Sequence, residues 1–120
     1  MNPIALLIYV DDVKAGLNWY KKAFPESKIV YIKDFDFTAL NINDFFLEIV
    51  QADEKVASGK FGTVMYWSVS ELNSTINRLE NLGAVLYRGP IAIENGLGMC
   101  QLEDPFGNLI GFRGVYKSST

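Results

Sequence analysis

The 120-residue sequence predicts an α+β fold of two successive βαβββ modules, whose strands form a curved mixed sheet around a trough. Short apolar runs of strand length are interrupted twice by a segment with the 3.6-residue periodicity of a helix. Turn residues separate the runs, and the same order of elements occurs twice along the chain. Module one is predicted at residues 1–52 and module two at residues 62–120, joined by a polar linker at 53–61 within a single domain.

Module one begins with an apolar run that predicts a buried strand. Asp11 and Asp12 can cap the helix that follows, and Pro25 ends it. Turn residues then divide three extended segments. The predicted elements are a strand at 4–10, a helix at 13–24, and strands at 28–33, 37–42 and 45–50.

Module two repeats this order. Ser70 is the predicted cap of its helix and Gly83 the stop. Gly89-Pro90 interrupts an extended segment, and residues 104–108 (DPFGN) form a strong turn signal. The predicted elements are a strand at 63–69, a helix ending at 82, an extended segment at 84–93, and strands at 99–103 and 109–115.

Composition excludes several classes of function. A net charge of −3 disfavours a nucleic-acid partner. The chain has no histidine, which rules out a Ser-His-Asp triad, a Cys-His pair and the usual zinc hydrolase site. Cys100 is the one cysteine, so no intrachain disulfide forms; we expect an inert buried thiol in a cytoplasmic protein. The first apolar run is too short to span a membrane, and we interpret it as a strand and not a signal peptide.

Strand alternation sorts the residues into two faces. One row of each strand is apolar and suits packing beneath a helix, whereas the other mixes apolar and polar side chains, as ligand-facing surfaces do. The predicted ligand-binding residues come from this second row and from the strand at 99–103. They are Leu7, Tyr9, Phe46, Glu48, Tyr66, Ser68, Gln101 and Arg113.

Each polar member of this set has an alternative role. Glu48 lies between apolar neighbours on its strand and is the candidate general base or acid, but it could equally form an ion pair or be solvated. Arg113 could bind an anionic ligand group, or pair with Glu48 or Glu103. Tyr9 and Tyr66 could stack on a planar ligand or belong to the core.

Four stretches carry a family resemblance: LLIYVDDVKAGLNWYKKAF, FFLEIV, VMYWSVSELNSTINRLENLGA and LEDPFGNLIGFRG. Together they resemble the vicinal oxygen chelate superfamily, which includes glyoxalase I, extradiol dioxygenases, and bleomycin- and fosfomycin-resistance proteins. The resemblance implies a glyoxalase-like fold and a homodimer. It places the family's four metal-ligand positions on Ala5, Glu48, Val64 and Gly111, of which only Glu48 has a donor side chain.

The resemblance therefore implies a member without metal or cofactor, in which the small residues Ala5 and Gly111 leave room where a metal shell would stand. The first functional hypothesis is a protein that sequesters an amphipathic or planar small organic ligand, as bleomycin-resistance proteins do. The alternatives are a metal-independent lyase or isomerase that uses Glu48 as general base, and a structural or regulatory dimer without a ligand.

Overall fold

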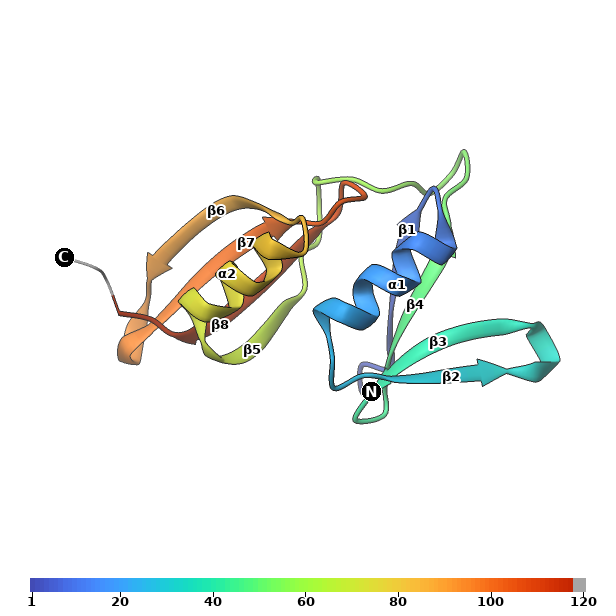
Figure 1. The fold of residues 1–120 in the computed structure, drawn as a ribbon, viewed down its shortest axis with the longest axis horizontal. Helices are drawn as coiled ribbons and strands as arrows, with labels where there is room; N and C mark the ends of the chain where they lie inside the picture. Colours follow the sequence, from blue (N-terminus) through green and yellow to red (C-terminus); the bar gives the residue numbers. More distant parts are fainter. Residues whose placement is uncertain (118–120) are drawn as a thin grey trace. The chain divides into compact units, whose positions relative to one another are not determined.

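The structure, a computed structural model, describes residues 1–117 and divides into two compact units. The N-terminal unit comprises Met1–Ser58, and the C-terminal unit starts at Gly59. Each contains one helix and a four-stranded mixed sheet (Figure 1), so the predicted α+β fold of two βαβββ modules is confirmed. Neither helix of residues 1–117 is long and apolar enough to cross a bilayer.

The N-terminal unit has the sheet order β1-β4-β3-β2, with β1 parallel to β4 and the other pairs antiparallel. Its helix starts where predicted, because the Asp12 carboxylate accepts a hydrogen bond from the Ala15 backbone N–H at 3.1 Å. The elements are β1 (Ala5–Val10), α1 (Val13–Ala23), β2 (Lys28–Ile32), a 3₁₀ turn (Lys33–Phe35), β3 (Phe37–Ile42) and β4 (Phe45–Gln51).

The C-terminal unit repeats this topology with the order β5-β8-β7-β6, and β5 is parallel to β8. The Asp104 carboxylate accepts backbone N–H bonds from Phe106 at 2.8 Å and Asn108 at 2.9 Å, which closes the turn between its last two strands. The elements are β5 (Tyr66–Glu71), α2 (Leu72–Asn81), β6 (Val85–Ala92), a 3₁₀ turn (Glu94–Gly96), β7 (Leu97–Glu103) and β8 (Leu109–Val115).

Each helix covers one face of its own sheet, and the apolar rows meet it there. In the N-terminal unit the buried face includes Val10, Leu47 and Ile49 beneath Trp19 and Tyr20 of α1. In the C-terminal unit the buried sheet residues are Cys100, Leu102, Ile110 and Phe112, and those of α2 are Leu72, Thr75, Ile76 and Leu79. We call the opposite side of each sheet its open face.

Both ends of the strand predicted at 63–69 are wrong. Strand β5 begins at Tyr66 and runs on to Glu71, because Glu71 still pairs with Val115 of β8. Ser70 is therefore held in the strand, and Glu71 precedes the helix without a side-chain cap. The predicted interruption at Gly89-Pro90 lies inside β6, which absorbs it through shifts in its register with β7.

Candidate functional site

The open face of the C-terminal unit is organised around the ring of Tyr66. Tyr66 on β5, Gly111 on β8 and Gln101 on β7 are register partners and form one row across three strands. A Cβ atom built on Gly111 would lie 2.7 Å from three atoms of the Tyr66 ring. The ring therefore lies directly on the Gly111 backbone, in space that only a residue without a side chain leaves open.

Two further side chains fix this ring. The Gln101 amide donates a hydrogen bond to the Tyr66 hydroxyl at 2.8 Å. The Arg113 guanidinium carbon lies 5.0 Å from the ring centroid, which is a cation–π contact. Tyr66, Gln101 and Arg113 thus form one connected cluster, which we call the Tyr66 cluster.

Arg113 is exposed and forms no ion pair with any carboxylate of residues 1–117. Glu103, one of its expected alternative partners, instead binds Lys60, with 3.2 Å between Nζ and Oε1. On the same open face Arg113 is the register partner of Ser68 and of Met99. The predicted residues Tyr66, Ser68, Gln101 and Arg113 therefore share one continuous surface.

The other four predicted residues lie on the open face of the N-terminal unit. Leu7 is the register partner of Glu48, and Tyr9 and Phe46 lie in the neighbouring rows of β1 and β4. Leu7 is 45% exposed, whereas the other three are half-buried. Glu48 makes no hydrogen bond or ion pair with the described residues of its own unit, so the structure shows nothing that would orient it as a base.

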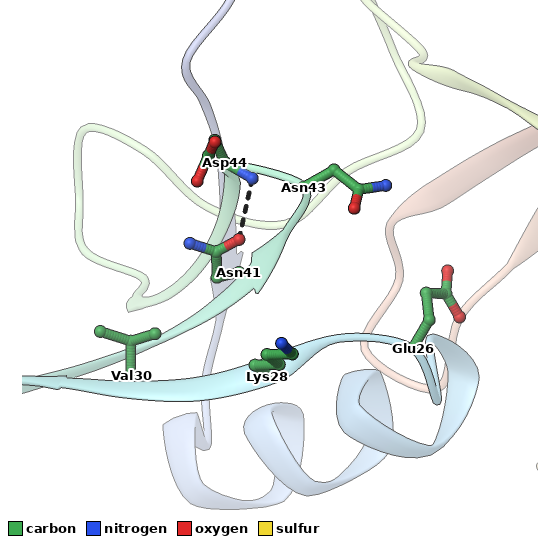
Figure 2. A pocket seen from close by; sticks show the side chains of 6 residues that line it. All are labelled: Glu26, Lys28, Val30, Asn41, Asn43 and Asp44. Carbon is green, nitrogen blue, oxygen red and sulfur yellow. Dashed lines mark hydrogen bonds between the residues drawn. The ribbon is translucent and has the colours of Figure 1, made fainter.

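The N-terminal unit also has a shallow depression of about 370 Å³ beside the β3–β4 turn (Figure 2). Asn41 lies on the same open face as Phe46, its register partner, and its side-chain oxygen accepts a hydrogen bond from the Asp44 backbone at 2.9 Å. The lining residues are Glu26, Lys28, Val30, Asn41, Asn43 and Asp44. The sequence prediction did not include this depression, since its lining combines the β3–β4 turn with residues from β2 and the segment before it.

The four positions that the resemblance assigns to metal ligands do not fit a metal ion. Ala5, Val64 and Gly111 have no donor atoms in their side chains, and residues 1–117 contain no group of three or more His, Cys, Asp or Glu that could hold one. The expectation that Gly111 leaves room is wrong, because the Tyr66 ring fills the space above it.

Cys100 is 1% exposed in the core of the C-terminal unit. Burial raises the pKa of its thiol to about 11, although a backbone hydrogen bond at Phe112 partly counteracts this. The thiolate is therefore disfavoured at neutral pH, which agrees with the expected inert thiol.

The chain matches one family description, Glyoxalase/Bleomycin resistance protein/Dioxygenase superfamily, over residues 2–112. No curated protein sequence matches it. Among solved structures, it resembles a glyoxalase/bleomycin resistance protein/dioxygenase family enzyme from Burkholderia phytofirmans PsJN, with a TM-score of 0.74, 16% identity, and coverage of 94% of this chain and 98% of that one.

Two further structures share the fold. TioX from Micromonospora sp. ML1 has a TM-score of 0.69 at 14% identity, with coverage of 97% of this chain and 100% of its own. The fosfomycin resistance protein FosX from Mesorhizobium loti has a TM-score of 0.69 at 14% identity, with coverage of 95% and 90%. At these identities the likeness concerns the fold alone.

Proposed function

The chain belongs to the Glyoxalase/Bleomycin resistance protein/Dioxygenase superfamily, and we propose that it sequesters an amphipathic or planar small organic ligand without using a metal ion. The observation that carries this proposal is the aromatic ring over Gly111. Where the resemblance assigns a metal ligand, this chain has Gly111, and the ring of Tyr66, in contact with an amide and a guanidinium, fills the space above it.

The open faces have the composition that a binding surface needs. They combine apolar side chains with polar groups, and such groups fix the orientation of a ligand. The proposed binding residues are Leu7, Tyr9, Phe46 and Glu48 in the N-terminal unit, and Tyr66, Ser68, Gln101 and Arg113 in the C-terminal unit.

Metal independence can be tested by thermal unfolding with Zn²⁺, Ni²⁺, Mn²⁺ or Fe²⁺. A ligand that binds only the folded state at 100 times its Kd stabilises it by about 2.7 kcal/mol, which raises the Tm by several degrees. We expect no rise with any of the four ions. A rise of several degrees with one of them would refute the metal-free proposal.

Binding alone can be separated from catalysis with Glu48→Gln. If the protein only sequesters its ligand, this variant should bind a neutral ligand as the wild type does, since Glu48 has no partner within its unit whose loss would disturb the fold. Turnover of a bound compound that disappears in Glu48→Gln would instead support the lyase or isomerase alternative.

We also propose a cytoplasmic homodimer. The single buried cysteine suits a reducing compartment, and family resemblance favours pairing. Light scattering after size exclusion should give twice the 13.5 kDa chain mass. A mass of one chain at micromolar concentration would contradict the dimer.

A further inference from the structure

We infer that the ligand is an aromatic carboxylate, anchored by its anionic group at Arg113 and Tyr66, with its ring on the apolar side chains of the same row. This inference rests on the proposed binding function and gives the ligand a chemical class. The first observation is the state of Arg113. Its charge is exposed, Glu103 forms its ion pair with Lys60, and no carboxylate of residues 1–117 neutralises Arg113.

The guanidinium is also held in place before any ligand arrives. Its contact with the Tyr66 ring restricts the long side chain, so less rotamer entropy is lost on binding. A planar fork of N–H donors matches the two oxygens of a carboxylate, with which it forms two parallel hydrogen bonds. A cationic ligand would be repelled at this position.

The hydroxyl of Tyr66 adds a second donor. Its oxygen accepts the hydrogen bond from the Gln101 amide, so its own proton points elsewhere and is available to an acceptor. The exposed hydroxyl of Ser68, the register partner of Arg113, lies on the same face. Arg113 and the Tyr66 hydroxyl therefore offer donors on the two sides of one contact, and the group that satisfies both is an anionic acceptor.

An apolar strip continues from this position across the sheet. Arg113 pairs with Met99 on β7, and Met99 pairs with Ile91 on β6, so the three share a row of the open face. Ile91 is 48% exposed although it is apolar. Two strand spacings of about 4.8 Å separate Arg113 from Ile91, so the strip is about 10 Å long and suits a fused bicyclic ring.

The test compares 2-naphthoate with 2-naphthamide by isothermal titration calorimetry, because the two differ only in the charge and geometry of the polar group. We expect the wild type to bind the acid at least tenfold more tightly than the amide. Arg113→Gln should lose at least tenfold in affinity for the acid and change little for the amide. Arg78→Gln is the matched control, since it removes the same charge from helix α2, and it should bind both compounds as the wild type does.

Two more variants cover the case in which Arg113→Gln folds poorly. Arg113→Lys keeps the positive charge but removes the planar pair of N–H donors, and this variant should bind the acid several-fold more weakly than the wild type. Tyr66→Phe keeps the ring but removes the proton donor and should also weaken binding of the acid alone. Thermal unfolding without ligand verifies that each variant is folded.

Equal affinities for acid and amide, or equal losses in Arg113→Gln and Arg78→Gln, would overturn the inference. Binding of 2-naphthamide or 2-naphthylmethylamine without 2-naphthoate would refute the carboxylate and leave the proposed binding function standing. If neither these three compounds nor a broad panel of aromatic metabolites binds, the proposed function itself fails.

Discussion

Replacement of Gly111 by alanine tests whether the Tyr66 cluster is held together by the absence of one side chain. The backbone at Gly111 is not in the left-handed region, so alanine can adopt its conformation. The new methyl group, however, would lie 2.7 Å from the Cγ, Cδ1 and Cδ2 atoms of the Tyr66 ring. These atoms are close to the backbone, so the whole ring must move away from β8.

The cost follows from the contacts that the ring would lose. The hydrogen bond from Gln101 contributes about 0.5–1.5 kcal/mol, and the exposed cation–π contact with Arg113 about 0.5–1 kcal/mol. Alanine restricts the unfolded chain and recovers about 0.4–1 kcal/mol. The net destabilisation is therefore about 1 kcal/mol, which is too small to identify its origin from one variant.

A double-mutant cycle with Tyr66→Phe, followed by urea unfolding, isolates the origin. Tyr66→Phe removes only the hydroxyl and should cost about 1 kcal/mol in the wild type. In the Gly111→Ala background the hydrogen bond is already broken, so the same change should cost nearly nothing, and the two sites should couple by about 1 kcal/mol.

Gly59→Ala is the control, because no atom lies within 4 Å of a Cβ at that position. Its effect should add to that of Tyr66→Phe without coupling. Equal costs of Tyr66→Phe in the wild-type and Gly111→Ala backgrounds would show that the ring does not depend on Gly111.

Three further predictions concern the scaffold. Asp104→Ala removes the carboxylate that accepts two backbone N–H bonds at 2.8 and 2.9 Å. The free energy of unfolding in urea should fall by about 3 kcal/mol, and a fall below 1 kcal/mol would contradict the role of Asp104 in closing the turn. Gly16→Ala places a methyl group 2.8 Å from Ile49. The overpacking should cost about 1–3 kcal/mol, which outweighs the gain of about 1 kcal/mol in helix propensity. A higher Tm of this variant in thermal unfolding followed by circular dichroism would contradict the prediction. Burial raises the pKa of the Cys100 thiol from its ordinary value of 9.0 to about 11, so the stability that comes from the neutral thiol is complete below pH 9 and is lost as the pH rises toward 11. The Tm of the wild type should therefore fall more steeply over this range than that of Cys100→Ala, and parallel curves would exclude the linkage.

Local signals in the sequence were sufficient to predict the fold class. Asp12 before an apolar helical stripe and Pro25 after it mark the ends of α1, and the structure has the helix between them. The end of β5 was mispredicted for a tertiary reason. Ser70 is a good cap by residue type, but pairing between Glu71 and Val115 keeps the backbone extended past it.

Strand alternation also placed the predicted C-terminal residues on one face, because register partners share a face. It could not show that Tyr66, Gln101 and Arg113 touch one another. That outcome depends on side-chain rotamers and on the register between β5 and β8, which brings Tyr66 opposite Gly111. A glycine inside a strand is the one signal that indicates a close approach of this kind.

Gly111 connects the absence of metal donors at the assigned positions with the proposed ligand site. A donor side chain at this position would need the space that the Tyr66 ring fills, since even a methyl group there would lie 2.7 Å from the ring. A metal shell and the Tyr66 cluster therefore exclude each other on this face. Substituting a histidine or glutamate at Gly111 alone would displace the ring before it supplied a ligand, and Ala5 and Val64 would still have no donor. On this sheet, the absence of a side chain at Gly111 makes room for an aromatic ring, and the Arg113 guanidinium lies 5.0 Å from the centroid of that ring.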